Sequence, residues 1–228
     1  MIKNKWVALI FRIISLSLAV AGILATPGEF VGNVTWGIFM WFTIQTNALA
    51  AILFAIFILL TVKSMSKEGH YGDSSYYPRF TMIAVTSILM MSLSYWIILA
   101  PNSILSICTF SNITTHGITP LLLVLDYALF TKPGSIKHRD VYYGTIFPLS
   151  FVIFTYIAVA LGYRYERFDG TYANYPYFFF DISTLGIGMV SAFIAGILVL
   201  IILIGYILYG IDRKRGHKKN INTKQNVA

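Results

Sequence analysis

The chain has 228 residues, of which 57% are hydrophobic and 11% are charged, and its mean hydropathy is +0.72. This composition leaves too little polar surface for a soluble globular protein of this length. The formal net charge of +8 requires no nucleic-acid partner, because a basic rim that meets anionic lipid headgroups at the cytoplasmic face accounts for it. The sequence therefore predicts an integral membrane protein.

Six segments are long and apolar enough, or nearly so, to cross a bilayer as helices, which takes about 20 apolar residues each. They are continuously apolar, whereas the strands of a membrane barrel would alternate apolar and polar residues. We expect an all-α bundle of six transmembrane helices as one domain, residues 1–212, followed by a basic cytoplasmic tail, residues 213–228. The expected spans are residues 6–26, 34–62, 77–100, 113–131, 141–162 and 182–211.

The distribution of Lys and Arg predicts the orientation of this bundle. With six spans, the N-terminus, the connections at 63–79 and 132–140, and the tail share one side of the membrane. Of the 17 Lys and Arg residues, only Arg164 and Arg167 lie in a connection on the other side. Because positively charged connections stay in the cytoplasm, we expect a multi-pass protein of the cell membrane with both termini cytoplasmic.

Polar residues inside the first two expected spans need an explanation, because hydrocarbon disfavours them. Arg12 lies about two turns from the inner start of the first span, where its side chain either snorkels to the interface or finds a partner. In the second span, Thr43 and Asn47 are four residues apart and share one helix face, with Gln45 between them in the chain. Polar residues at this depth either join helices or take part in chemistry.

The fourth expected span contains the richest polar chemistry. Asn112, Thr114 and Thr115 are candidate helix caps, which would place His116 near the first turn. The positive end of the helix dipole disfavours an imidazolium there, so we expect a neutral histidine that accepts a proton. Pro120 has no N–H group, so the carbonyl of His116 loses its usual partner within the helix. A purely structural histidine that bridges helices is the alternative.

Asp126 lies in the same span, about 15 Å below His116 and on a different side of the helix, so it does not orient that histidine. Its depth in the membrane matches that of Arg12. Either charge alone in hydrocarbon would be strongly unfavourable. We therefore expect Arg12 and Asp126 to form a buried structural ion pair.

Thr43 and His116 fall about one helical turn apart in depth, so their helices allow a contact between them. A threonine hydroxyl needs an adjacent base to become a nucleophile, and a neutral histidine is the usual base. The donors that an oxyanion needs would come from Asn47, from Gln45 or from a free backbone N–H at the start of the fourth helix. The four histidines, at 70, 116, 138 and 217, are too scattered for a metal site. No metal and no cofactor are expected.

The fifth and sixth expected spans are predicted to form part of the structural framework rather than the site. Gly188, Ala192 and Gly196 form a stripe of small residues at a spacing of four, which is typical of close helix packing. The connection at 163–181 is crowded with aromatic residues, notably YPYFFFD at 175–181. We expect it to lie in the membrane interface, either as a simple aromatic belt or as a cover over an entrance from the outer leaflet.

Three motifs carry a resemblance to a known family. They are WFTIQTNALAAI in the second span, HGITPLLLVLDYALF in the fourth and NYPYFFFDI before the sixth. The chain resembles the bacterial six-span integral membrane proteins, which are distantly similar to the androgen-induced protein and the androgen-dependent TFPI-regulating protein. The resemblance implies a threonine hydrolase within the bilayer that cleaves fatty-acid esters of hydroxy fatty acids, with Thr43 and His116 essential. Residues 44–47 depart from the animal pattern.

The leading hypothesis is an intramembrane lipid-ester hydrolase with Thr43 as nucleophile and His116 as general base, acting on a fatty-acyl ester that enters from the outer leaflet. The alternative is a non-enzymatic six-span protein, either a small transporter or a lipid-binding scaffold, in which the polar residues only join helices. Both side chains facing one lipid-accessible cavity would favour the enzyme, and their separation onto different faces would favour the scaffold.

Overall fold

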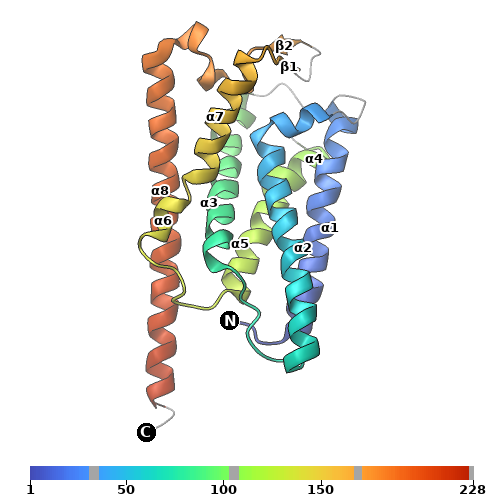
Figure 1. Cartoon of the computed structure of the whole chain (residues 1–228), viewed down its shortest axis with the longest axis vertical. Coiled ribbons are helices and arrows are strands. Elements are labelled where there is room, and N and C mark those ends of the chain that lie inside the picture. The colour runs from blue at the N-terminus through green and yellow to red at the C-terminus, as the bar shows by residue number, and fades with distance from the viewer. Residues whose placement is uncertain (31–35, 103–107, 167–170, 226–228) are drawn as a thin grey trace.

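The computed structural model describes residues 1–30, 36–102, 108–166 and 171–225 of the chain. Within these residues it confirms an all-α, multi-pass architecture, with six helical segments long and apolar enough to cross a membrane. These segments are Lys5–Thr26, Phe42–Glu68, Pro78–Leu99, Phe110–Phe130, Asp140–Ala160 and Ile182–His217. Both chain ends lie at the same end of the bundle (Figure 1).

Several spans are built from more than one helical element, and a short antiparallel hairpin lies at the end of the bundle away from the termini (Figure 1). The α-helices are α1 Lys5–Phe30, α2 Phe42–Glu68, α3 Pro78–Ser94, α4 Phe110–Ile113, α5 Thr119–Phe130, α6 Asp140–Tyr143, α7 Ile146–Ala160 and α8 Ile182–Gln225. The shorter elements are η1 Trp36–Met40, η2 Tyr95–Leu99, η3 Ala100–Asn102, η4 Thr114–Ile118, β1 Tyr165–Glu166, β2 Tyr172–Ala173 and η5 Phe178–Phe180.

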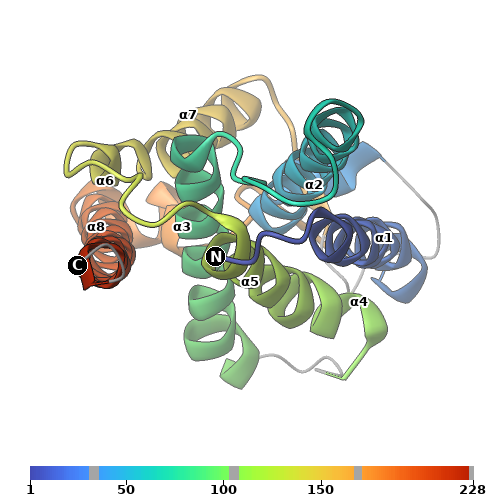
Figure 2. The same cartoon turned by 90° about the horizontal axis from the view of Figure 1, so that it is seen from below.

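The helices pack around α3. This helix contacts α2, α5 and α8, while α1 packs most extensively along α2. Seen along the bundle, α1 and α8 occupy opposite edges with α3 between them (Figure 2). Phe54, Phe57, Val85, Ile88 and Leu123 are among the buried residues of the core between these helices.

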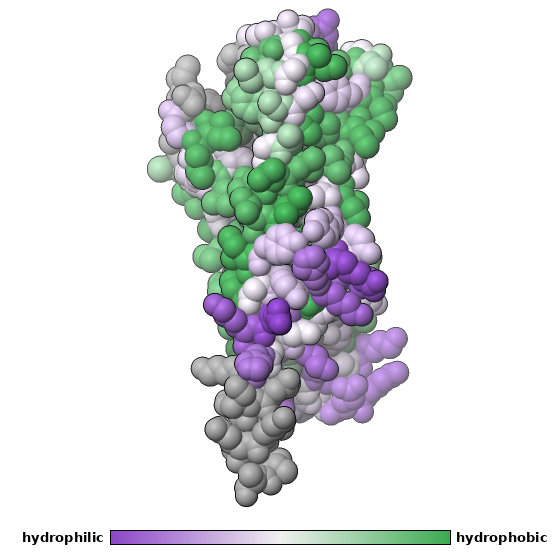
Figure 3. Space-filling view, turned by 90° about the vertical axis from the view of Figure 1, so that its left-hand side faces the viewer, coloured by the Kyte–Doolittle hydropathy of each residue, from purple (hydrophilic) through white to green (hydrophobic). Residues whose placement is uncertain are grey.

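The outer surface of the bundle is also apolar. Leu59, Ile97 and Ile187 are at least 70% exposed, as suits side chains that face lipid rather than water. Figure 3 shows hydrophobic residues over the middle of one face and hydrophilic residues gathered toward the end that carries the termini. This distribution fits a chain that crosses a membrane.

The second span begins later than expected, at Phe42. Residues Trp36–Met40 form a 3-10 helix, and Trp41 has extended backbone with φ −96° and ψ 135°, so the chain enters α2 only after this turn. The expected start at position 34 lies outside the described residues. As a consequence, Thr43 belongs to the first turn of α2, where backbone N–H groups have no carbonyl partner within the helix.

The fourth span begins earlier than expected, at Phe110. Thr109 caps it, because its Oγ1 accepts a hydrogen bond from the N–H of Asn112 at 3.2 Å. The caps proposed from the sequence therefore lie inside the helix. His116 belongs to the second turn of the span, next to the first turn.

The sixth span corrects a further expectation. The stripe of Gly188, Ala192 and Gly196 does not pack against another described helix, because a Cβ added at either glycine would meet nothing within 4 Å. Close approach occurs instead at Gly205, where an added Cβ would lie 2.8 Å from Cγ1 of Val141. The spacing of small residues does not reveal which side of a helix faces a neighbour.

Helix α8 also continues through much of the expected tail, and residues 226–228 lie outside the described part.

Candidate functional site

The structure brings Thr43 and His116 together from two spans. Thr43 lies in the first turn of α2, and His116 lies in η4, a π-helical turn within the fourth span. Oγ1 of Thr43 is 3.2 Å from Nε2 of His116, which is within hydrogen-bond distance. Both residues are half-buried. The elements that hold them lie at the end of the bundle opposite to the termini (Figure 1).

A proline shapes the helix around His116. Pro120 has no N–H group, so it cannot bond the carbonyl of His116 four residues earlier. The chain forms a single π-helical turn here and continues as α5. The free carbonyl of His116 accepts hydrogen bonds from the third span, from Ser92 Oγ at 2.6 Å and from Trp96 Nε1 at 2.9 Å. The third span thus supplies hydrogen-bond donors in place of the N–H group that Pro120 lacks.

The hydrogen bonds of the imidazole ring assign its proton. Nδ1 of His116 lies 3.2 Å from the backbone carbonyl oxygen of Asn112 and 3.2 Å from Oγ1 of Thr115. Because a carbonyl oxygen only accepts hydrogen bonds, Nδ1 carries the proton in the neutral ring. Nε2 then presents its lone pair to the hydroxyl of Thr43. This is the tautomer that a general base for Thr43 requires.

Tyr95, from the third span, covers one face of the imidazole. The ring centroids of Tyr95 and His116 are 3.6 Å apart, and the ring planes differ by 22°. Nδ2 of Asn112 donates a hydrogen bond of 2.6 Å to the hydroxyl of Tyr95. Asn112 thus holds both rings, one through its side chain and the other through its carbonyl. Neither Tyr95 nor this use of Asn112 was expected from the sequence.

The two side-chain amides proposed as oxyanion donors hydrogen-bond elsewhere. Nδ2 of Asn47 donates to the carbonyl oxygens of Thr43 at 2.8 Å and Thr115 at 3.0 Å. Asn47 is fully buried, and these bonds tie α2 to η4 at the level of the site. Nε2 of Gln45 donates to the carbonyl of Phe39 at 2.9 Å. The structure therefore gives Asn47 a positioning contact and directs Gln45 to the turn before α2.

Tyr177 joins the site from the connection that precedes α8. Its phenol interacts with the side chain of Thr43 and with the backbone of Phe42 and Thr43. Burial raises the pKa of Tyr177 to about 12, so the phenol keeps its proton at neutral pH. The run of aromatic residues at 175–181 was expected to form either an interfacial belt or a cover over an entrance, and no pattern in it distinguished Tyr177 from its neighbours.

Thr43 opens onto an apolar cavity that holds about 610 Å³ of empty space, including the space at its mouth. Thr43, Ser94, Tyr95 and Tyr177 contribute its polar groups. The rest of its wall is apolar and comes from the third, fifth and sixth spans, the start of α2 and the connection before α8, through Phe42, Met90, Met91, Leu99, Pro148, Leu149, Phe151, Val152, Phe179, Phe180, Ile194, Ile197 and Leu198. His116 lies behind Thr43 and Tyr95, which both line the cavity. A pocket with one polar end and apolar walls suits an acyl chain that carries a polar group.

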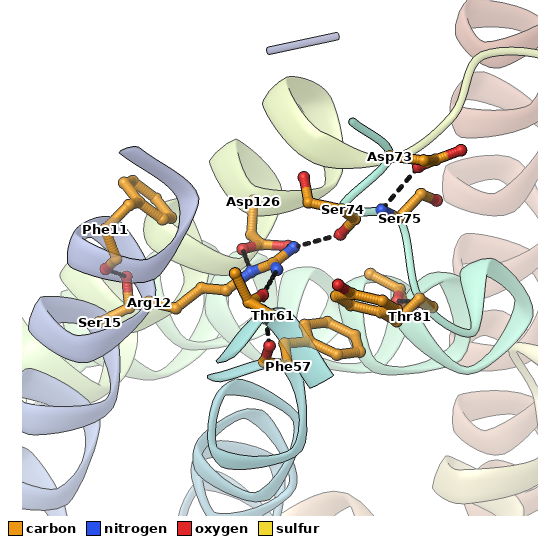
Figure 4. A network of polar contacts seen from close by, with 11 residues as sticks. Phe11, Arg12, Ser15, Phe57, Thr61, Asp73, Ser74, Ser75, Thr81 and Asp126 are labelled. Carbon is orange, nitrogen blue, oxygen red and sulfur yellow. Dashed lines mark hydrogen bonds and ion pairs between the residues drawn. The ribbon is translucent and has the colours of Figure 1, made fainter. Parts of the chain in front are cut away.

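The ion pair expected between Arg12 and Asp126 is present, and Figure 4 shows it with the residues around it. Nε of Arg12 lies 2.7 Å from Oδ2 of Asp126, and Nη2 lies 3.2 Å from Oδ1. The two side chains are each about 1% exposed. This bidentate arrangement is the strong form of an Arg–carboxylate pair.

The remaining guanidinium donors of Arg12 also find partners. Nη1 donates to Oγ1 of Thr61 at 2.8 Å, and Nη2 donates to the carbonyl of Ser74 at 3.0 Å. The rings of Phe57, Tyr76 and Phe130 surround the guanidinium at centroid distances of 5.0, 5.6 and 5.2 Å. The network links the first, second and fourth spans to the connection before α3. It does not touch Thr43 or His116.

Within the described residues, no group of three or more His, Cys, Asp or Glu side chains is placed to hold a metal ion. The site combines a hydroxyl, an imidazole and a phenol around an apolar cavity. No family model, curated protein or solved structure matches this chain. Its function is inferred from the geometry of this site.

Proposed function

We propose that this protein is an intramembrane lipid-ester hydrolase, of the type that cleaves fatty-acid esters of hydroxy fatty acids, with Thr43 as nucleophile and His116 as general base. The observation that carries the proposal is the 3.2 Å contact between Oγ1 of Thr43 and Nε2 of His116 at the polar end of an apolar cavity. Adjacency of a hydroxyl and an oriented base is the arrangement that activates a threonine.

The reaction proceeds through an acyl-threonine intermediate. Nε2 of His116 accepts the proton of the Thr43 hydroxyl as Oγ1 attacks the ester carbonyl carbon. The same imidazole then protonates the leaving alcohol. A water molecule, deprotonated by His116, releases the fatty acid and restores Thr43. The carbonyl of Asn112 keeps the proton on Nδ1 and stabilises the imidazolium that forms in each half.

The proposed substrate follows from the wall of the cavity. Met90, Met91, Phe151 and Ile197 are among the apolar residues that would contact an alkyl chain, while Thr43 lies at its polar end. A site at the end of the bundle opposite to the termini would receive this ester from the outer leaflet if both termini are cytoplasmic. The basic end of the chain would then face anionic lipid headgroups at the cytoplasmic surface.

Labelling with a fluorophosphonate that carries an alkyl chain tests the assignment of Thr43. We expect purified protein to be labelled, Thr43→Ala to lose the label and Thr43→Ser to keep it, because serine retains the hydroxyl. Thr46→Ala is the matched control, since the hydroxyl of Thr46 lies one turn along α2 and bonds the carbonyls of Phe42 and Thr43. His116→Ala should slow labelling by about 10²- to 10⁴-fold.

A well-folded Thr43→Ala protein that is labelled as fast as the wild type would sink the assignment. Size-exclusion chromatography in detergent and the thermal unfolding midpoint separate loss of chemistry from loss of fold. Equal loss of label in Thr46→Ala and Thr43→Ala would point to general damage at the start of α2 instead.

The second candidate is a lipid-binding protein without catalytic activity. The apolar wall of the cavity favours it, because such a wall binds an acyl chain whether or not a reaction follows. Under this alternative, a fluorescent fatty acid binds the wild type and Thr43→Ala with equal affinity, and neither protein is labelled by the fluorophosphonate. Turnover of a fatty-acyl ester that requires Thr43 excludes this candidate.

A further inference from the structure

Tyr177 approaches the proposed nucleophile from a third part of the chain, the connection between β2 and η5. Its phenol interacts with the side chain of Thr43 and with the backbone of Phe42 and Thr43, and both Tyr177 and Thr43 line the cavity. Phe42 and Thr43 begin α2, where N–H groups lack a carbonyl partner within the helix. The phenol therefore lies beside the proposed nucleophile and the first turn of α2.

The ring of Tyr177 is held by other aromatic rings. It stacks on Phe179 with centroids 5.2 Å apart and planes 6° apart, and it meets Trp41 edge to face at 5.8 Å. Phe151 and Phe180 contact it at centroid distances of 6.3 and 6.1 Å. Rings packed in this way limit rotation of the side chain, so the position of the phenol oxygen is set before a substrate binds.

An ester carbonyl attacked by Thr43 develops negative charge on its oxygen, and this charge needs hydrogen-bond donors that are already in place. The amides of Asn47 and Gln45 donate to backbone carbonyls instead. Tyr177 lines the same cavity as Thr43 and carries a hydroxyl that can donate. It is thus placed where the charge would develop.

We infer that Tyr177 is a catalytic residue whose hydroxyl donates a hydrogen bond to the ester carbonyl oxygen in the transition state. The inference rests on the proposed function. Oγ1 of Thr43 interacts with the phenol of Tyr177 and lies within hydrogen-bond distance of Nε2 of His116, and Nδ1 of His116 donates to the carbonyl of Asn112. When an ester binds, the phenol O–H donates to its carbonyl oxygen.

The role of Tyr177 can be followed through the acylation step. Oγ1 of Thr43 forms a bond to the carbonyl carbon, its proton passes to Nε2 of His116, and the π electron pair of the carbonyl moves onto its oxygen. That oxygen accepts a hydrogen bond from Tyr177. As the bond to the leaving alcohol breaks, the pair returns to re-form the carbonyl, and the alkoxide takes the proton from His116. Tyr177 keeps its own proton throughout.

Tyr177→Phe tests the inference, because it removes only the hydroxyl and keeps the ring. With full-length protein in detergent and a p-nitrophenyl fatty-acyl ester, we expect kcat to fall by about 10²- to 10³-fold while KM stays within about twofold. Tyr175→Phe is the matched control. Tyr175 lies in the same connection, but its ring packs on Tyr156 at 5.7 Å and it does not line the cavity. Its kcat should equal that of the wild type.

The results that would overturn the role of Tyr177 differ from those that would overturn the proposed hydrolase. If Tyr177→Phe keeps kcat while Thr43→Ala abolishes turnover, Tyr177 is not catalytic and the proposed hydrolase stands. If Thr43→Ala turns over the ester like the wild type, both proposals are overturned. If Tyr177→Phe lowers the unfolding midpoint as well as kcat, damage to the fold could explain the loss of activity, so a variant that keeps the hydroxyl is needed.

Incorporation of a difluorotyrosine at position 177 provides that variant, because it keeps the ring and the hydroxyl but lowers the pKa of the phenol. Once the phenol ionises it no longer donates, so kcat of this variant should fall at alkaline pH with the pKa of the fluorinated ring. The wild type should show no such fall below about pH 10. Superimposable pH profiles of the two proteins would overturn the role of Tyr177.

Discussion

Asn112 offers its backbone carbonyl to Nδ1 of His116, and this acceptor decides which ring nitrogen faces Thr43 with a free lone pair. The side chain of Asn112 holds Tyr95, which covers the imidazole. The site therefore depends on contacts between individual atoms around a single ring. A second network of hydrogen bonds surrounds Arg12, and there the contacts hold a charge pair.

Asp126→Ala tests the structural role of that pair. The change leaves the guanidinium of Arg12 buried without its carboxylate, which should cost about 3–5 kcal/mol of stability. We expect a large loss of folded protein in the membrane and a lower thermal unfolding midpoint for what remains. Fluorescence-detection size-exclusion chromatography of the solubilised protein measures both quantities.

Replacing both members of the pair provides the control. Arg12→Met with Asp126→Leu removes the charges together, so the double variant should accumulate better than Asp126→Ala alone. Because the network does not touch Thr43 or His116, labelling per folded molecule should be preserved in the double variant. Normal accumulation of the Asp126→Ala protein would show that the pair does not stabilise the fold.

At the scale of elements, the fourth span shows how a local sequence feature acts through its neighbours. The proline at position 120 leaves one carbonyl free, the helix adopts a π-helical turn, and Ser92 and Trp96 of the third span take up that carbonyl. Because Pro120 has no N–H group, the carbonyl of His116 bonds to the third span, and this contact joins the third and fourth spans. His116 is positioned at this junction.

Pro120→Ala should raise or maintain stability while lowering activity. The new N–H can bond the carbonyl of His116 within the helix, and a regular α-helix interior favours alanine over proline by about 3 kcal/mol. The turn would then become α-helical and move the imidazole relative to Thr43, and a shift of about 1 Å can cost about 10²-fold in rate. The unfolding midpoint and the rate of fluorophosphonate labelling check the two effects.

Pro78→Ala is the matched control for this change. Pro78 is the first residue of α3, where no backbone N–H is needed, so its replacement should leave labelling unchanged. A Pro120→Ala protein that is labelled at the wild-type rate would contradict the role given to the π-helical turn.

At the scale of the whole molecule, the two ends of the bundle differ in character. Figure 3 shows hydrophilic residues gathered toward the end with the termini, and the candidate site lies at the opposite end. The Arg12–Asp126 network lies between the first, second and fourth spans nearer to the termini. The molecule thus separates a polar network that joins its helices from a polar site that opens onto a cavity.

The single cysteine gives a direct test of orientation. Cys108 is exposed and lies just before α4, at the end opposite to the termini. If both termini are cytoplasmic, a membrane-impermeant maleimide should label Cys108 in intact cells. His217→Cys in a Cys108→Ser background should be labelled only after the cells are permeabilised. The reverse pattern would contradict the proposed orientation and the entry of substrate from the outer leaflet.

The sequence by itself determined where the membrane spans lie along the chain and how deep each polar residue lies along its helix. Apolar run length located the membrane spans, and the constant rise of a helix matched Arg12 with Asp126 and Thr43 with His116 in depth. It did not determine how each helix is rotated about its axis. For that reason Thr43 and His116 were only candidates for contact, and the stripe at Gly188 was expected to pack closely although it meets no other described helix.

Only the tertiary structure decided which groups meet around the site. The cap at Thr109, the carbonyl of Asn112 on His116 and the donation of Asn47 to the carbonyls of Thr43 and Thr115 depend on how helices and turns pack. Tyr177 comes from a connection more than a hundred residues away from Thr43, and it carries no local signal of its position. Contacts between distant segments are set by packing, so helical spacing alone does not predict them.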